Sequence, residues 1–348
     1  MNLLYHCFLL SLLYILSCTV SAQETVVKGA APQADRLRSS EITLIAEQES
    51  VMGEDGGYLA NPSVVDCFAE MSYQYTGGRY DDETIKFRLR MPDRIIPGKE
   101  YPLVVWLHGV GESGEDNKRQ LAHIQSTMEF LAGPNKLDFY ILATQCPGDN
   151  RTWTTSISND EKGDAPLTIT LEILEQVLND FPIDTNRISI VGVCSGGAGA
   201  WSLLKAKPNF FSAVAVFATS PPTGLSWHEH CHGTALWAFN NRDDGQAPVE
   251  PMRRFVNQVN QSGELAYLTE RYGGHDTHTL AIRKDKIVAW LITQNRTKTA
   301  PPPGFTTYVY SDNWKPFFLF ALPILLSIPF AVLQIVRRWC AIQKTRKS

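Results

Sequence analysis

The feature that most constrains the fold is a turn at residues 188–197, which read Ile-Ser-Ile-Val-Gly-Val-Cys-Ser-Gly-Gly. The apolar run at its start is typical of a buried parallel strand, and the small residues after it let a helix begin at once. In such a strand–turn–helix the central residue has a strained backbone, so its neighbours two positions away must be very small. Gly192 and Gly196 flank Cys194 at those two positions. The pattern therefore predicts that Cys194 projects from the turn as a nucleophile.

Ser195 is the alternative centre of this turn. Centring the pattern on Ser195 places the β-branched Val193 in the first small position, which is the poorer steric fit. A purely structural role for Cys194 also stays open, because buried cysteines usually behave as inert small apolar side chains.

Short apolar runs and helical patterns alternate along the middle of the chain. Residues 85–91 alternate strictly between polar and apolar, which predicts a half-exposed strand. Continuous apolar runs predict buried strands at 103–107, 140–143, 188–191, 213–217 and 235–239, and apolar spacing predicts helices at 167–181 and 280–293. This alternation predicts an α/β fold with a mostly parallel central sheet and helices on both faces. The active site of such a sheet lies at the carboxyl ends of its strands.

Two later segments supply partners for a nucleophile. Asp243 and Asp244 follow the predicted strand at 235–239, and His275 lies in the run Tyr-Gly-Gly-His-Asp. The chain order nucleophile, acid, histidine is that of α/β-hydrolases. In that arrangement the acid orients the imidazole, with Asp244 as the first choice and Asp243 as the alternative. His278 stays open as an alternative base.

Four motifs in the correct order give a more specific resemblance. They read His-Gly-Val-Gly-Glu-Ser-Gly-Glu-Asp-Asn at 108–117, Gln-Cys-Pro at 145–147, Pro-Ile-Asp-Thr-Asn-Arg-Ile at 182–188 and Gly-Ala-Gly-Ala-Trp at 197–201. These motifs resemble the HGxGExGxDN, QCP, DxNRI and GxGxW segments of secreted esterases related to polyhydroxybutyrate depolymerases, often described as predicted peptidases. The likeness covers about residues 75–290. It implies an α/β-hydrolase fold and hydrolysis of esters.

The resemblance assigns roles residue by residue. The nucleophilic serine of the family falls on Cys194, its acid on Asp244 and its histidine on His275. Its oxyanion hole would use the backbone N–H groups of Ser195 and of a residue near Val110. The motif residues that support these groups are His108, Gly109, Gly192 and Gly196.

Two departures from the family pattern affect the expected chemistry. Asn240 and Asn241 replace the usual His-Gly before the acid, and Cys194 replaces the serine, as happens in other hydrolases of this fold such as dienelactone hydrolases. A histidinium and a helix N-terminus both favour the thiolate form of a cysteine, which attacks an ester to give an acyl thioester that water hydrolyses. Thiolates expel amines poorly, so we expect carboxylic esters as substrates. The alternatives are a catalytically inactive surface binding protein and a peptidase or acyltransferase of the same fold.

The two ends of the chain predict export and anchoring. Residues 1–22 are uncharged, largely apolar and end in small residues, which predicts a signal peptide cleaved before Gln23, with lipidation of Cys18 as the alternative. Residues 316–337 include 20 consecutive uncharged residues, enough for a transmembrane helix, and the basic segment 338–348 predicts a cytoplasmic tail. We expect a single-pass type I protein of the cell membrane with an extracytoplasmic catalytic domain.

Between these ends we expect a lead-in segment at 23–69, an α/β-hydrolase domain at 70–293 and a Pro-containing linker at 294–315. Residues 23–315 hold 27 basic and 36 acidic residues, and this net charge of −9 argues against a nucleic-acid partner. The expected partners are a small-molecule or polymer ester and, through the C-terminal helix, the lipid bilayer. No cofactor is expected.

The cysteines of the middle region leave a question open. Cys67, Cys146, Cys194 and Cys231 are an even set that suits two disulfides in an oxidising compartment. If Cys194 is a free nucleophile, at least one of the other three is unpaired.

A histidine-rich run at 228–232 resembles a metal site at first sight. His228, His230 and His232 would share one face of an extended segment. Zinc sites usually draw their ligands from separated elements, and no second cluster in the sequence completes this one. We therefore expect a solvated loop and no metal.

Overall fold

The computed structural model describes residues 51–54, 56–76, 82–132, 136–147, 153 and 166–297. The predicted signal peptide, most of the lead-in segment, the predicted transmembrane helix at 316–337 and the basic tail at 338–348 lie outside the described residues. Within the described ranges, no helix combines the length and the apolar character that a membrane span needs.

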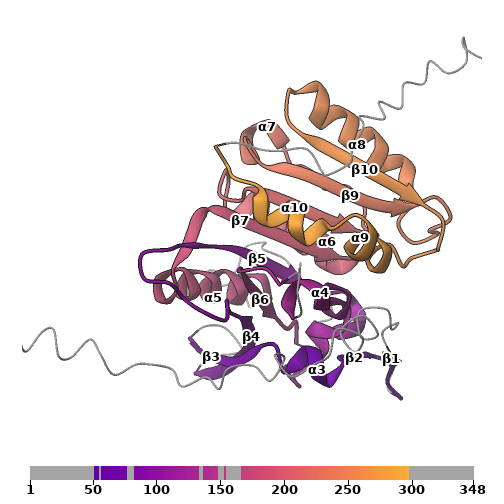
Figure 1. Cartoon of the computed structure of the whole chain (residues 1–348). Coiled ribbons are helices and arrows are strands. Elements are labelled where there is room, and N and C mark those ends of the chain that lie inside the picture. Colours follow the sequence, from indigo (N-terminus) through magenta and orange to yellow (C-terminus); the bar gives the residue numbers. More distant parts are fainter. Residues whose placement is uncertain are drawn as a thin grey trace, which may run out of the picture. The chain divides into compact units, whose positions relative to one another are not determined.

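An eight-stranded sheet, in the order β10-β9-β8-β7-β5-β6-β4-β3, forms the centre of the described region (Figure 1). Neighbouring strands from β10 to β6 are parallel, while β4 and β3 are antiparallel additions at one edge. The mostly parallel sheet predicted from the sequence is thus confirmed. Its strands are β3 (Ala69–Tyr75), β4 (Glu83–Arg90), β5 (Tyr101–Leu107), β6 (Tyr140–Thr144), β7 (Ile183–Val193), β8 (Ala213–Phe217), β9 (Ala235–Asn241) and β10 (Ala266–Arg271).

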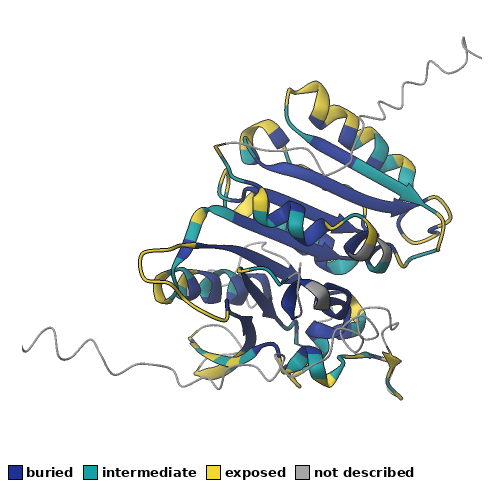
Figure 2. Cartoon of the chain, in the orientation of Figure 1, coloured by how far each residue is buried: buried dark blue, intermediate teal, exposed yellow. Residues whose placement is uncertain are grey.

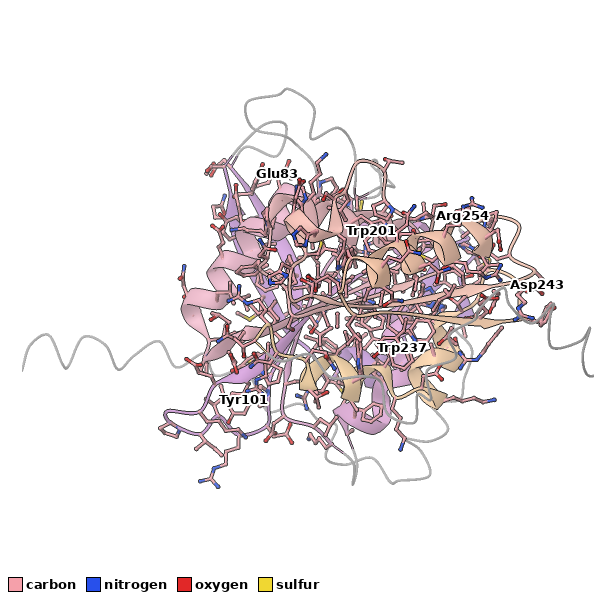
Figure 3. All side chains as sticks on the ribbon, turned by 90° about the horizontal axis from the view of Figure 1, so that it is seen from above. Glu83, Tyr101, Trp201, Trp237, Asp243 and Arg254 are labelled. Atoms are coloured by element: carbon pink, nitrogen blue, oxygen red, sulfur yellow. The ribbon has the colours of Figure 1, made fainter. Side chains whose placement is uncertain are left out.

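Helices cover both faces of this sheet. Figure 3 shows the helices that carry Trp201 and Arg254, α6 and α8, on one side of the sheet, and α9 and α10 on the other. The longer helices are α5 (Pro166–Asp180), α6 (Ser195–Ala206), α8 (Val249–Gln261), α9 (His278–Lys284) and α10 (Ile287–Thr293). The short ones are α3 (Pro62–Val65), α4 (Met128–Leu131), α7 (Trp227–His230) and the 3₁₀ helices η3 (Val110–Glu112) and η4 (Arg119–Thr127).

The central strands are buried on both faces, as Figure 2 shows for the middle of the sheet. In β9, Leu236 belongs to the apolar cluster that includes Met252 of α8. The next residue, Trp237, turns to the opposite face, where its ring centroid lies 5.3 Å from that of Trp290 in α10. This period-two alternation lets one strand supply apolar surface to two helical layers, which explains its continuous apolar sequence.

The strand at 85–91 departs from the half-exposed strand predicted by its pattern. Its second half, in β4, is fully buried, including Arg88 and Arg90. Arg88 donates from Nε to the carbonyl oxygen of Asn117 at 2.7 Å, and its Nη2 pairs with Glu70 at 3.0 Å. Buried charges persist only with such partners. The two arginines are polar residues of an interior strand, so reading them as an exposed face was wrong.

The single helix expected at 280–293 is divided into α9 and α10. Lys286 lies between them in the left-handed region, with φ 53° and ψ 41°, which an α-helix of L-residues does not continue through. Asp285 at the break pairs with Arg271 of β10 at 2.6 Å. A long-range ion pair therefore accompanies a break that the local apolar spacing does not reveal.

The end of the predicted lead-in segment has regular structure. Strands β1 (Val51–Met52) and β2 (Tyr58–Leu59) form a short antiparallel pair, and α3 follows before β3 begins at Ala69. The polar, small-residue composition of this segment gave no sign of these elements.

Candidate active site

Cys194 occupies the sharp turn between β7 and α6, with φ 52° and ψ −112°. A methyl group added to Gly192 would lie 2.4 Å from the carbonyl oxygen of Gly196, and one added to Gly196 would lie 2.1 Å from the carbonyl oxygen of Leu107. Neither position has room for a side chain, because backbone atoms fill the space. The turn thus has the backbone that its two glycines predicted, with Cys194 at the strained position.

The turn is fixed by main-chain bonds and leaves the thiol half-buried. The N–H of Cys194 donates to the carbonyl oxygen of Phe217 in β8 at 2.8 Å, and its own carbonyl accepts from Gly197 at 3.0 Å. Ser195 is the first residue of α6, and its Oγ is buried without a hydrogen-bond partner among the described residues. The structure therefore places the cysteine, not the serine, at the centre of the turn.

Asp244 and His275 meet at the carboxyl ends of β9 and β10. Nδ1 of His275 lies 2.8 Å from Oδ2 of Asp244. The other oxygen, Oδ1, accepts from the backbone N–H groups of Gln246 at 2.8 Å and Ala247 at 3.0 Å. Asp244 is only 4% exposed, so its carboxylate is held in one orientation and fixes the imidazole in turn.

The imidazole of His275 faces both the acid and the thiol. Its interaction with Cys194 is the strongest influence on it, burial opposes that influence, and Asp244 adds to it; together they raise the pKa of His275 to about 9. Nε2 of His275 is buried and makes no hydrogen bond to any described residue. His275 is therefore largely protonated at neutral pH, with the sulfur on one side and the carboxylate on the other.

Asp243, the alternative acid, does not reach the imidazole. Its carboxylate accepts from the backbone N–H groups of Gly273 at 3.0 Å and Gly274 at 3.1 Å, and these bonds lower its pKa. Figure 3 shows Asp243 at the outer edge of the molecule. Asp243 thus holds the loop that leads to His275, while Asp244 holds the ring.

Asn240 and Asn241, which replace the usual His-Gly, also hold these loops. Nδ2 of Asn240 donates to the carbonyl oxygen of Thr219 at 3.0 Å, which ties β9 to the loop after β8. Nδ2 of Asn241 donates to the carbonyl oxygens of Gly274 at 3.0 Å and Asp276 at 3.1 Å. One sequence signal points to this role: two consecutive amides at the end of a buried strand need internal partners.

The segment after β5 approaches Cys194 from the other side. A methyl group on Gly109 would lie 3.6 Å from Cβ of Cys194, so the backbone that leads into Val110 and η3 passes directly beside the turn. Buried His108 holds this segment: its Nε2 accepts from the N–H of Cys146 at 2.9 Å, and its Nδ1 donates to the carbonyl oxygen of Gly109 at 2.6 Å. Burial lowers the pKa of His108, which keeps that neutral tautomer.

A polar cluster behind this segment was not predicted from the sequence. Glu112 is 1% exposed and lies 3.0 Å from Nε2 of His123, an interaction that lowers the pKa of its carboxyl although burial opposes it. The ring of His278 packs 4.0 Å from that of His123, and burial lowers its pKa well below the usual value. His278, the alternative base, belongs to this cluster, while His275 holds the contact with Asp244.

A cavity of about 770 Å³ runs beside α6. Ala198, Trp201, Ser202 and Lys205, which line it, follow Cys194 at helical spacing, so they extend along the same side of the helix. Its other wall is the loop after β8, with Thr219, Ser220, Pro221, Pro222, Thr223 and Leu225.

The chain was also compared with known families and proteins. Residues 80–265 match the family Esterase, described as "Putative esterase". No match is found among curated proteins. A thermostable esterase of known structure is 25% identical, with a TM-score of 0.58 over 71% of this chain and 70% of that one.

Two further structures are more distant. A ferulic acid esterase from Anaeromyces mucronatus is 16% identical, with a TM-score of 0.45 over 65% of this chain and 90% of that one. An acylaminoacyl peptidase from Pyrococcus horikoshii is 14% identical, with a TM-score of 0.46 over 68% of this chain and 43% of that one.

Proposed function

The chain belongs to the Esterase family of α/β-hydrolases, and from that premise we propose that it hydrolyses carboxylic esters through a Cys194–His275–Asp244 triad. One observation carries the proposal: a strained turn presents Cys194 to an imidazole whose other nitrogen lies 2.8 Å from a buried carboxylate. A nucleophile, a base and an orienting acid in this relation form the arrangement of covalent hydrolases.

In the first half of the reaction, the Cys194 thiolate attacks the ester carbonyl carbon and a C–S bond forms. The negative charge moves to the carbonyl oxygen, where the backbone N–H groups of Ser195 and Val110 act as the oxyanion hole. The intermediate collapses and breaks the C–O bond, and protonated His275 gives its proton to the departing alkoxide. The products of this half-reaction are an alcohol and an acyl thioester on Cys194.

In the second half, neutral His275 removes a proton from water as the water attacks the thioester carbonyl. The C–S bond breaks, the carboxylic acid leaves, and the thiolate and imidazolium are restored. Asp244 holds the ring in one tautomer and stabilises its charged form throughout.

The same chemistry favours esters over amides. In the tetrahedral intermediate formed from an amide, the Cys194 thiolate is a better leaving group than the amine. The amine leaves only after it has received a proton. The cavity beside α6 begins at Ala198, one helical turn after Cys194, and Trp201 and Leu225 in its lining supply apolar surface for one part of the ester.

Export and membrane anchoring complete the proposal. They are supported by the apolar segments at 1–22 and 316–337 and by the basic tail at 338–348. The triad would then act outside the cytoplasm, tethered to the membrane through residues 294–315.

The triad is tested with p-nitrophenyl acetate and the full-length chain in detergent. We expect Cys194→Ala to abolish turnover and acetylation, because it removes the thiol that forms the acyl thioester. Ser195→Ala is the matched control, one residue away with a buried hydroxyl, and should retain activity within about tenfold, since the amide N–H that it contributes is unchanged. Mass spectrometry should locate the transient acetyl group on Cys194.

Equal losses in the two variants would show that the assignment to Cys194 is wrong. A wild-type chain that neither acetylates nor turns over any activated ester would instead favour the inactive binding protein.

A further inference from the structure

A second cluster of chemically active side chains lies far from the triad. One ligand atom each from His228, His232 and Glu264 falls within 4.8 Å of the others. Nδ1 of His232 lies 2.6 Å from Oε1 of Glu264, and the two imidazole rings have centroids 6.1 Å apart. Among the described residues, this is the one group of three with the spacing to hold a metal ion.

The local fold explains why these two histidines come together. The segment is not extended: α7 makes a single turn at Trp227–His230, and the chain turns again at His232. His228 and His232 therefore lie side by side. His230 points elsewhere, with its Nδ1 3.0 Å from the carbonyl oxygen of Ser226.

Cys231 is excluded from the cluster although it lies between the histidines in sequence. Its side chain is fully buried in the apolar cluster that includes Trp227, whereas the side chains of His228 and His232 are exposed.

Glu264 supplies a third ligand from a separate part of the chain. The sequence alone indicates no such partner for the histidine run. It lies 32 residues after His232, directly before β10, and its side chain is 12% exposed. Its second oxygen, Oε2, accepts from the N–H of Gly233 at 3.3 Å, while the N–H of His232 donates to Oδ1 of Asn209 at 2.9 Å. These hydrogen bonds hold the carboxylate of Glu264 and the backbone of His232 in place before an ion binds. Hydrogen bonds around known metal sites orient the ligands in the same way.

We propose that His228, His232 and Glu264 bind one divalent transition-metal ion, with zinc as the reference ion and water at the remaining position. Two imidazoles and a carboxylate are a donor set that zinc accepts, with bonds of about 2.0–2.2 Å. Tetrahedral geometry then needs ligand atoms about 3.3 Å apart. The 2.6 Å contact must open slightly and the wider contacts, up to 4.8 Å, must close, which rotation of exposed side chains allows.

The position of the site indicates what the ion would do. α7 precedes β9, so the cluster lies at the amino ends of β9 and β10, whereas Asp244 and His275 follow their carboxyl ends (Figure 1). An ion there would join the turn before β9 to the turn before β10. The ion would stabilise the two strands, β9 and β10, that precede the acid and the histidine. The metal-site proposal is therefore independent of the proposed hydrolysis.

The test uses the untagged full-length chain in detergent, in a Cys194→Ala background so that zinc has no thiolate at the proposed active site. After chelator treatment and its removal, the chain is titrated with ZnCl₂ by calorimetry and its melting temperature is followed. We expect one equivalent to bind and the melting temperature to rise by several degrees, because the ion binds the folded state. Co²⁺ should give d–d bands without a thiolate charge-transfer band.

Single variants then identify the ligands. His228→Ala, His232→Ala and Glu264→Gln should each weaken zinc binding at least tenfold and remove the melting shift. His230→Ala is the matched control from the same segment and should bind as the parent does. Because His228 is an exposed side chain, its loss leaves the fold intact, and circular dichroism checks this.

The site would be overturned by a lack of stoichiometric binding at micromolar zinc, or by equal losses in His230→Ala and His228→Ala. A thiolate band with Co²⁺ would assign the ion to a cysteine and would also overturn the proposed ligand set.

Discussion

The two halves of the candidate triad are positioned in different ways. Cys194 is held by backbone packed on backbone, where Gly192 and Gly196 leave no space for even a methyl group. Asp244 and His275 lie on loops, where side chains such as Asn241 and Asp243 hold the main chain through hydrogen bonds of 3.0–3.2 Å.

This difference teaches where the site tolerates change. A steric contact between main chains has no alternative arrangement, so an added atom must displace a strand or a helix. A loop held by several hydrogen bonds loses one of them and keeps the others, at about 1 kcal/mol for each. A substitution at the glycines of the Cys194 turn should therefore cost much of the stability of the fold. A substitution that removes one hydrogen bond from the Asp244 or His275 loop should have a smaller effect.

The largest effect is expected from Gly196→Ala. Its methyl group would lie 2.1 Å from the carbonyl oxygen of Leu107, so we expect a loss of about 3 kcal/mol or more in the free energy of unfolding. Denaturant unfolding measures it. Gly245→Ala is the matched control, since nothing lies within 4 Å of that position, and should change stability by less than about 0.5 kcal/mol. Similar values for both variants would contradict the steric account of the turn.

The next effect is on activity and compares two adjacent carboxylates. Asp244→Asn should lower kcat by about 10²- to 10⁴-fold with the fold intact, because the amide favours the wrong imidazole tautomer. Asp243→Asn weakens only the loop before His275 and should cost less than about tenfold, as loss of one supporting bond does. Steady-state kinetics on an activated ester separates the two. A larger loss at Asp243 would move the acid assignment to that residue.

The smallest effect concerns the ionisation of His275. With a pKa of about 9, it donates its proton below that pH and loses this ability above it, so kcat/KM should fall about tenfold per pH unit beyond pH 9. The imidazole titration, followed by NMR, should shift to lower pH in both Cys194→Ala and Asp244→Asn, and further in the former, because the contact with Cys194 is the stronger influence. Activity that keeps rising through pH 10 would exclude the imidazolium as the acid.

The sequence predicted those parts of the fold whose cause is local. The buried parallel strands β5, β6, β8 and β9 appear as continuous apolar runs, and the turn at Cys194 follows from two glycines at fixed offsets. The strand β3 was not predicted, since its alternation of Glu70, Ser72 and Gln74 with apolar residues matters only once β4 pairs with it. β10 and α8 were likewise not predicted from the sequence.

The candidate site divides in the same way. Chain order and motifs pointed to the three triad positions, because each follows a strand that ends at one edge of the sheet. The contacts of Asn241 with the His275 loop, of Glu112 with His123 and of His232 with Glu264 join residues 11 to 35 positions apart. No local spacing encodes such pairs, so only the folded chain reveals them.

The described cysteines differ in how readily they meet oxidants. Three of them, Cys67, Cys146 and Cys231, are buried, and Cys194 is half-buried. Burial raises the pKa of Cys67 to about 11 and that of Cys231 to about 12, so both stay protonated and unreactive. Cys194 alone is half-exposed and faces a histidinium. Under mild peroxide, we expect Cys194, the proposed nucleophile, to become a sulfenic acid while the buried cysteines stay reduced. Oxidation would then remove the proposed activity before it lowered the stability of the fold.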